Sequence, residues 1–203
     1  MKKVAVIDYG MGNLMSVWRA WQHAGADAKI ISSPTEMSGA DVLVFPGQGC
    51  IIDTIKLLKQ TGFDNAIREW IAQDKPFFGI CLGLQALFEY SEEGDVDCLG
   101  IFKGSVKRLR LPHQYKVPHM GWNQLNVVKE CPILEGIDKE YFYFVHSYYA
   151  IPDDSEIIAG TCDYGIDVTA ALSRNNLFST QFHPEKSGEP GLKILKNFVN
   201  IKE

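Results

Sequence analysis

The residue best suited to chemistry is Cys81, which lies in the segment GICLG at residues 79–83. The pattern G-x-C-x-G is typical of a nucleophile elbow, in which a buried strand turns sharply into a helix and exposes its nucleophile at the tip. We expect that strand at residues 77–80 and that helix at residues 82–90. A thiol at a helix N-terminus is favoured as the thiolate, and the Leu82 N–H would face an oxyanion. The alternative is a buried structural cysteine in a glycine-flanked turn.

A cysteine nucleophile needs a base that a third group holds in place. Among five histidines, His183 stands out because it follows an apolar run directly, in the segment QFHPE at residues 181–185. A histidine just beyond a strand lies on the rim where open α/β sheets carry their sites. Pro184 fixes the local backbone, so Glu185 can hold the imidazole in the tautomer that takes a proton from sulfur. The alternative is a turn with a surface ion pair.

The elements that must position these residues alternate between apolar runs and helix-like segments. In the first half we expect strands at residues 4–7, 28–31, 42–45 and 77–80, and helices at 14–21, 63–71 and 82–90. Apolar strands separated by helices are typical of a parallel sheet covered on both faces. The second half predicts strands at residues 106–109, 125–128, 141–145, 157–159, 168–172 and 177–182, some of them antiparallel, and a terminal helix at 191–199.

Composition limits the function classes. The 203 residues carry a formal net charge of -5, which argues against non-specific nucleic-acid binding. No run of about 18 apolar residues exists, so we expect no membrane span. Five cysteines, an odd number without a C-x-x-C pair, predict reduced thiols in the cytoplasm and neither a disulfide framework nor a zinc site. We find no linker or repeat, so we expect a single domain over residues 1–203.

Two segments together carry a family resemblance. GICLGLQ at residues 79–85 and QFHPE at residues 181–185 resemble the class I, triad-type glutamine amidotransferases, in the order that the family has them. The resemblance implies a flavodoxin-like α/β fold, with a mostly parallel sheet and additional antiparallel strands. It also implies that Cys81 forms a γ-glutamyl thioester from glutamine, that His183 protonates the departing ammonia and that Glu185 orients His183. It implies no metal and no cofactor.

The same resemblance assigns further residues. Backbone groups of Gly47, Gln48 and Leu82 would form the oxyanion hole, and the residues expected to bind glutamine are Gly49, Gln85, His146, Ser147 and Tyr148. From their own sequence context, residues 46–49 are equally well a simple βα turn, Gln85 a helical surface residue and residues 141–149 an aromatic core strand. The family usually has valine where this chain has Gln48, whose side chain could occupy part of the pocket or alter how the loop rearranges.

A narrower resemblance covers nearly the whole chain. DYGMGNL (8–14), VPHMGWN (117–123), YFVHSY (143–148) and EKSG (185–188) are similar to the glutaminase subunits of imidazole glycerol phosphate synthase. Those subunits form a heterodimer with a separate (βα)8-barrel cyclase subunit. The ammonia is used there to make imidazole glycerol phosphate for histidine biosynthesis and an aminoimidazole carboxamide ribotide. The resemblance places Met120, Trp122 and Asn123 on the face that meets the cyclase, although a tryptophan in a glycine-bearing loop is equally often a loop anchor.

Three alternatives remain open from the sequence. The first is a glutaminase subunit that feeds ammonia to a different synthase, such as a sugar-amidating system. The second is a stand-alone cysteine hydrolase or peptidase on the same fold, which would need no partner. The third is a catalytically silent binding module, against which the intact Cys81, His183 and Glu185 set argues.

Overall fold

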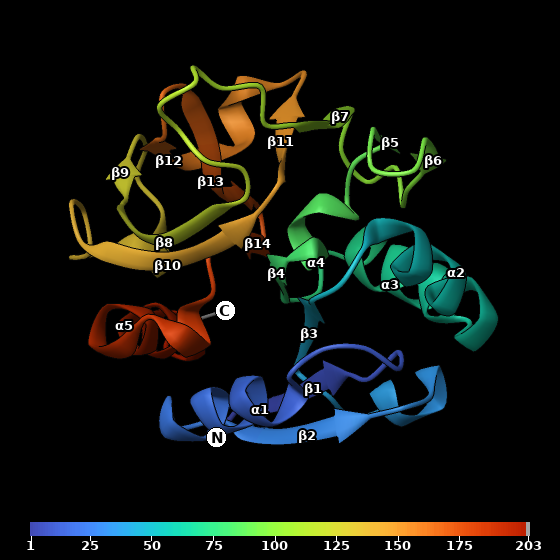
Figure 1. Cartoon of the computed structure of the whole chain (residues 1–203). Helices are drawn as coiled ribbons and strands as arrows, with labels where there is room; N and C mark the ends of the chain where they lie inside the picture. Colours follow the sequence, from blue (N-terminus) through green and yellow to red (C-terminus); the bar gives the residue numbers. More distant parts are fainter. Residues whose placement is uncertain (202–203) are drawn as a thin grey trace.

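An eight-stranded sheet forms the centre of the computed structural model, which describes residues 1–201 (Figure 1). Its strand order is β2-β1-β3-β4-β14-β13-β12-β9. Five strands run parallel: β2 (Asp27–Ile31), β1 (Lys3–Ile7), β3 (Val42–Gly47), β4 (Phe77–Cys81) and β14 (Leu177–Thr180). Three antiparallel strands extend the sheet: β13 (Asp167–Arg174), β12 (Ile158–Asp163) and β9 (Asn126–Val127). The predicted α/β class, with a mostly parallel sheet and antiparallel additions in the second half, is confirmed.

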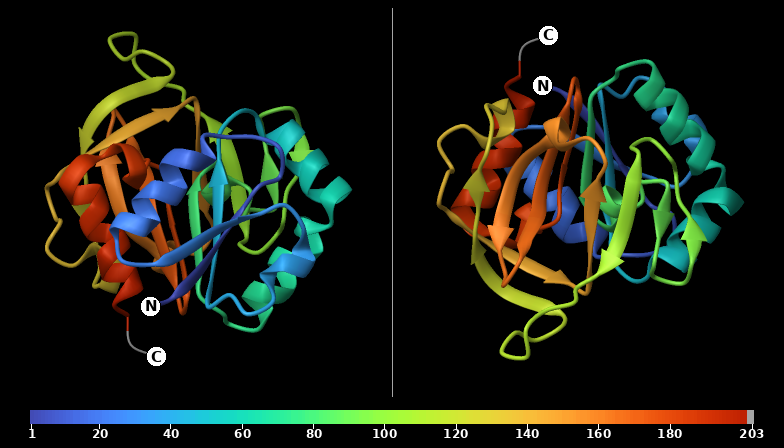
Figure 2. Two further views of the ribbon diagram at one scale, coloured as in Figure 1. Left: turned by 90° about the horizontal axis from the view of Figure 1, so that it is seen from below. Right: turned by 90° about the horizontal axis from the view of Figure 1, so that it is seen from above.

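Helices cover both faces of this sheet, as Figure 2 shows. On one face lie α1 (Leu14–His23) and α5 (Gly188–Val199), and on the other lie α2 (Ile51–Thr61) and α3 (Phe63–Ala72). Side chains of a strand point alternately to the two faces. In β1, Val4 and Val6 accordingly pack with the α1 side, and Ala5 and Ile7 pack with the α2 and α3 side. No helix within residues 1–201 is long and apolar enough to cross a membrane.

Two smaller sheets complete the fold. An antiparallel ribbon joins β8 (His119–Gln124) to β10 (Tyr141–His146). A four-stranded sheet has the order β11 (Tyr148–Pro152), β7 (Gly104–Arg108), β5 (Tyr90–Ser91) and β6 (Val96–Asp97). The chain passes from β10 to β11 through the single residue Ser147, so one short segment links the ribbon to the four-stranded sheet.

Several predicted elements differ from the observed ones at their boundaries. The expected strand at 125–128 is only β9, and the expected strand at 177–182 ends at Thr180. The strand expected at 157–159 begins at Ile158, after a 3-10 turn at Ser155–Ile157. The helix α2 and the strands β5, β6, β8 and β11 were not predicted.

Candidate active site

Cys81 lies at a strained turn between β4 and α4 (Leu82–Gln85). Its backbone has φ 53° and ψ -103°, a conformation that costs on the order of 1–3 kcal/mol for a residue with a side chain and persists only where the surroundings impose it. Three glycines make room for the turn. A Cβ atom on Gly83 would run into the carbonyl oxygen of Phe45, one on Gly47 into Leu82, and one on Gly79 into the backbone of Gly83. The predicted elbow geometry is therefore present.

The helix after the elbow is shorter than predicted. It was expected to span residues 82–90, but α4 ends at Gln85. The backbone carbonyls of residues 86–88 do not continue the helix, because they accept hydrogen bonds from the backbone N–H groups of residues 99–102. The dipole of one helical turn is small, since it grows with the number of aligned peptide units. The positive group that faces the sulfur is instead His183.

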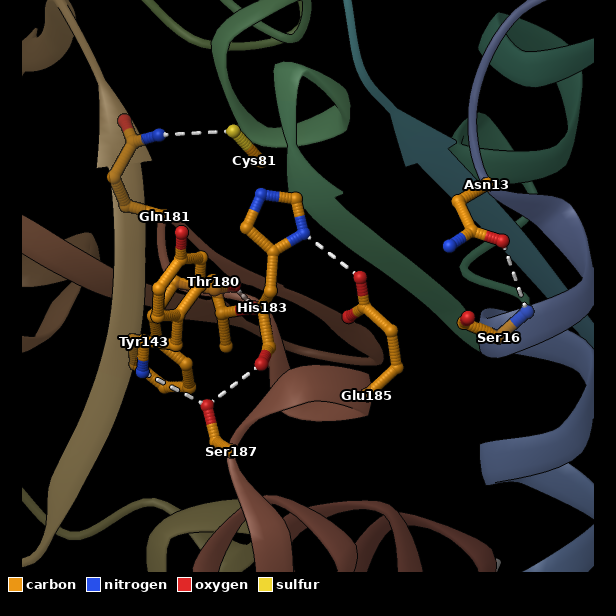
Figure 3. Close-up of polar contacts among 10 residues, drawn as sticks. Asn13, Ser16, Cys81, Tyr143, Thr180, Gln181, His183, Glu185 and Ser187 are labelled. Carbon is orange, nitrogen blue, oxygen red and sulfur yellow. Dashed lines mark hydrogen bonds and ion pairs between the residues drawn. The ribbon is translucent and has the colours of Figure 1, made fainter. Parts of the chain in front are cut away.

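The imidazole of His183 lies between the Cys81 sulfur and the Glu185 carboxylate (Figure 3). Its Nδ1 is 2.8 Å from Glu185 Oε1, and both side chains are buried, with 2% and 1% of their surface exposed. The ring's other nitrogen, Nε2, faces the sulfur. Burial alone lowers the pKa of His183, but the negative charge of the Cys81 thiolate and the contact with Glu185 together raise that pKa to about 10. The His183 imidazole is therefore held as imidazolium at neutral pH.

Backbone contacts fix His183 after the end of β14. The His183 N–H donates to the Tyr143 carbonyl of β10 at 3.0 Å. The Ser187 hydroxyl donates to the His183 carbonyl at 2.6 Å and accepts from the Tyr143 N–H at 3.0 Å. Residues Pro184–Lys186 form a 3-10 turn, which brings Glu185 back beside the ring. This turn explains how one short segment can supply both the imidazole and the carboxylate that bonds it.

A cavity of about 440 Å³ opens over Cys81. Its lining includes every residue that the sequence assigned to chemistry or glutamine binding except Glu185, which lies behind His183. The lining residues so assigned are Gly47, Gln48, Gly49, Cys81, Leu82, Gln85, His146, Ser147, Tyr148 and His183. The structure thus brings together segments from β3, β4, β10, β11 and the end of β14.

Four further lining residues were not predicted from the sequence: Glu93, Pro118, Val145 and Lys186. Glu93 comes from the turn between β5 and β6, and its Oε2 accepts a hydrogen bond from the Ile51 N–H at 2.9 Å. This bond ties that turn to the first turn of α2, which follows the loop at residues 46–49. The exposed Lys186 lies directly after Glu185, and its Nζ is 5.8 Å from the ring centre of Tyr143. The position of Lys186 beside the H-P-E motif was the available signal, whereas no sequence pattern marks Glu93.

A fifth residue that was not predicted, Gln181, contacts the sulfur itself. Its Nε2 lies 3.5 Å from Cys81 Sγ (Figure 3). Its Oε1 accepts a hydrogen bond from Gln85 Nε2 at 3.0 Å. Gln85 Nε2 also donates to the Tyr148 carbonyl at 2.8 Å. The nitrogen of Gln85 is therefore used within the chain, and the group it can offer a ligand is its carbonyl oxygen. Gln181 belongs to the QFHPE segment, so its proximity to His183 in sequence was the available signal.

Two residues predicted for binding, His146 for glutamine and Asn123 for the partner, have side chains that already make hydrogen bonds within the chain. His146 Nε2 is 3.0 Å from His119 Nδ1, and His146 Nδ1 is 2.8 Å from the Tyr148 carbonyl. Both ring nitrogens of His146 are therefore used within the chain. Asn123 differs from the other two expected interface residues: its amide bonds the Asp163 carbonyl at 2.8 Å on the inner side of β8.

The outer side of the β8 and β10 ribbon is apolar and exposed. Met120 is 61% exposed and Trp122 is 58% exposed. The residues paired with them across the ribbon are Val145 and Tyr143, and Tyr141 follows on the same face. We call these five residues, Met120, Trp122, Tyr141, Tyr143 and Val145, the ribbon face. It is continuous with the cavity, because Val145 belongs to both.

The chain resembles known proteins in both sequence and fold. The family model described as glutamine amidotransferase class-I matches residues 5–201. The chain is 50% identical over 200 residues to "Imidazole glycerol phosphate synthase subunit HisH" of Dehalococcoides mccartyi, covering 98% of this chain and 97% of the relative. It is 49% identical over 199 residues to the protein of the same name from Methanothermobacter thermautotrophicus, covering 98% of each. Among solved structures, PurLQS from Thermotoga maritima shares the fold with a TM-score of 0.78 at 17% identity, covering 98% of both chains.

Proposed function

The chain belongs to the class I glutamine amidotransferases, and within them to the HisH subunits of imidazole glycerol phosphate synthase, and we propose that Cys81, His183 and Glu185 are its glutaminase triad. It is an enzyme of histidine biosynthesis that hydrolyses glutamine to glutamate and ammonia. The observation that carries the assignment of the triad is the buried His183 imidazole, which faces the Cys81 sulfur with one nitrogen and bonds Glu185 with the other.

The geometry suits a two-step hydrolysis. The Cys81 thiolate attacks the side-chain carboxamide carbon of glutamine, and backbone N–H groups of Gln48 and Leu82 stabilise the oxyanion. His183, protonated at the start, gives its proton to the amide nitrogen, so the C–N bond breaks and ammonia leaves. His183 then takes a proton from water, which attacks the thioester and releases glutamate. Glu185 holds Nδ1 and stabilises the imidazolium whenever it forms.

The cavity also offers groups for the rest of the substrate. We assign the α-amino and α-carboxylate groups of glutamine to the segment His146, Ser147 and Tyr148, which lines the cavity. The Glu93 carboxylate, at the cavity wall, adds a negative group that suits the α-ammonium. Gln85 also lines the cavity, and its side-chain carbonyl oxygen is an acceptor that it can offer the substrate.

The name that the relatives share identifies them as one component of a synthase, and a partner for this chain is therefore implied. We propose that this partner is a (βα)8-barrel cyclase and that it docks on the ribbon face. An exposed aromatic and methionine surface is typical of interface cores, and this one borders the cavity in which ammonia forms. Ammonia that escaped to water at pH 7 would be protonated, so a route that leads directly into a partner preserves its nucleophilicity.

We place the chain in the cytoplasm. All five cysteines are unpaired, and Cys81 must remain a free thiol to act, which fits a reducing compartment.

A paired assay tests this function. Glutamate release is measured for the chain alone, then with a separately purified cyclase subunit and its nucleotide ligand, each beside the Cys81→Ala variant. We expect little turnover alone, strong stimulation by the liganded partner and none with Cys81→Ala. Equal rates with and without the partner would contradict the subunit assignment, and full turnover by Cys81→Ala would contradict the triad.

A further inference from the structure

A buried histidine pair lies next to the site without being part of the triad. His119 is 2% exposed and His146 is 6% exposed, and the His119 ring stacks on Phe144 and Tyr164 with ring centres 4.7 and 3.9 Å away. Their nearest nitrogens, His119 Nδ1 and His146 Nε2, are 3.0 Å apart. Only one of two facing nitrogens can carry the proton in a hydrogen bond, so the direction of this bond has to be deduced from the outer contacts.

Asn123 decides the direction at one end. Its Oδ1 accepts from the Gln124 N–H at 2.7 Å, and its Nδ2 donates to the Asp163 carbonyl at 2.8 Å. An N–H group only donates and a carbonyl only accepts, so the Asn123 amide has a single consistent orientation. Its Nδ2 is also 3.3 Å from His119 Nε2, and that nitrogen must therefore be the acceptor.

The proton positions of both histidines follow. A neutral imidazole has one donor and one acceptor nitrogen, so His119 donates from Nδ1 to His146 Nε2. His146 then donates from Nδ1 to the Tyr148 carbonyl, 2.8 Å away, which can only accept. Burial lowers the pKa of His119 to about 4 and that of His146 to about 3, so both rings are neutral at pH 7, as this arrangement requires.

The Tyr148 carbonyl joins this chain of hydrogen bonds to the nucleophile. It also accepts from Gln85 Nε2 at 2.8 Å, which fixes the Gln85 amide. The same nitrogen faces Gln181 Oε1 at 3.0 Å, which fixes the Gln181 amide in turn. Gln181 Nε2 is thereby directed at Cys81 Sγ, 3.5 Å away, as a donor. The donor and acceptor groups between Asn123 and the sulfur are thus fixed by backbone carbonyl and N–H groups, either directly or through a neighbouring side chain.

We propose that Gln181 is a catalytic residue that donates a hydrogen bond to the Cys81 thiolate, and that His119 and His146, with Gln85, are positioning residues that hold its amide in the donating orientation. The proposal rests on the proposed function only in taking Cys81 as the nucleophile. A hydrogen bond donated to the sulfur stabilises the thiolate relative to the thiol. The Tyr148 carbonyl is the shared acceptor through which the histidine pair acts.

The test follows the reactivity of Cys81 without glutamine or partner. The rate of Cys81 alkylation by iodoacetamide is measured against pH by peptide mass spectrometry in the full chain. Gln181→Glu replaces the donor with an isosteric carboxylate, and His119→Phe keeps an aromatic ring but removes both nitrogens. Gln22→Glu is the matched control, since Gln22 is a half-buried glutamine of α1, outside the site, that donates to the Ala28 carbonyl of β2.

We expect the midpoint of the alkylation profile to rise by about one pH unit or more in Gln181→Glu, and to rise by less in His119→Phe. Gln22→Glu should match the wild type. In the partner-stimulated glutaminase assay, kcat should fall in both site variants with a smaller change in KM. A folded His119→Phe variant with the wild-type alkylation profile would overturn the positioning role, and an unchanged profile in Gln181→Glu would overturn the donor.

A second measurement on the unmodified chain keeps the proposal testable if a variant fails to fold. Long-range ¹H–¹⁵N spectra of the histidine rings distinguish the two neutral tautomers. His119 and His146 should both carry their proton on Nδ1 at pH 7, and a proton on Nε2 of either ring would contradict the deduced order of donors and acceptors. Because neither readout involves glutamine, a failed glutaminase assay with a shifted alkylation profile would reject the proposed function while leaving this inference standing.

Discussion

Replacing Glu185 gives the sharpest test of the triad, because two substitutions separate its charge from its hydrogen bond. Glu185→Gln keeps an oxygen that can accept from His183 Nδ1 but removes the charge, and Glu185→Ala removes both. The native contact is 2.8 Å between two side chains that are 1–2% exposed. A hydrogen bond to a charged group contributes about 1.5–3 kcal/mol and a neutral one about 1 kcal/mol.

Full burial places this contact in the upper part of that range, at about 2–3 kcal/mol. Glu185→Ala should then lower kcat about 30- to 150-fold, since about 1.4 kcal/mol corresponds to a factor of ten. Glu185→Gln retains the neutral part and should lower kcat about 5- to 30-fold. The order of the two variants is as informative as their size.

The assay is glutamate release with saturating glutamine, partner and nucleotide ligand. Glu189→Gln, the same change at an exposed position in the first turn of α5, serves as the control and should keep the wild-type kcat. Glu185→Gln within twofold of the wild type would refute the argument that a buried charge stabilises the His183 imidazolium. Equal losses in Glu185→Gln and Glu185→Ala would show that charge alone matters and refute the separate hydrogen-bond contribution.

Four further outcomes are expected. Gln48→Val should change the glutaminase rate without the partner more than the rate with it, since Gln48 lines the cavity from the loop at residues 46–49. Equal effects in both assays would count against a role of Gln48 in rearranging that loop. Trp122→Ala should weaken partner binding by about 2 kcal/mol, about 30-fold in Kd by titration calorimetry, whereas Val128→Ala, exposed but off the ribbon face, should not. Gly83→Ala should lower the free energy of unfolding in denaturant by about 1–3 kcal/mol, because the added methyl meets the Phe45 carbonyl. In the folded chain the pKa of His119 is about 4, below the ordinary 6.5, so the stability that the neutral ring contributes is complete above pH 6.5 and is lost as pH falls toward 4. The thermal midpoint of unfolding should drop over that window, and it should drop less steeply in His119→Phe.

Local patterns were sufficient for the parallel part of the sheet and for selecting Cys81, His183 and Glu185 as the candidate triad. The strands β1, β3 and β4 are short apolar runs, and both catalytic segments directly follow such runs. Parallel strands place their carboxyl ends at one edge of the sheet, so Cys81 at the end of β4 and His183 after β14 could be expected to approach each other. The helix α2 carried a usable signal too, because Ile51, Ile55 and Leu58 are spaced for one helical face, although no element was assigned there.

Other features depend on contacts that no local pattern contains. An apolar spacing of Leu84, Leu87 and Phe88 fits a helix, yet the chain turns after Gln85 because a distant segment, residues 99–102, takes the backbone carbonyls. The strand β8 (sequence HMGWNQ) lacks a clean apolar alternation, because its buried positions hold a histidine and a half-buried asparagine. A histidine is ambiguous in sequence, and only the distance of 3.0 Å between their nitrogens shows that His119 and His146 bond each other.

The two sides of strand β8 have different roles in the structure. Met120 and Trp122 point outward on the ribbon face, and His119 and Asn123 point inward to the hydrogen bonds that lead to Cys81. Because side chains alternate with a period of two, deleting or inserting one residue in this strand would exchange the two sides at once. The six residues of β8 are therefore constrained in number as well as in kind. Point substitutions can be tolerated one side at a time, whereas a change of length would remove the proposed docking surface and the polar contacts together.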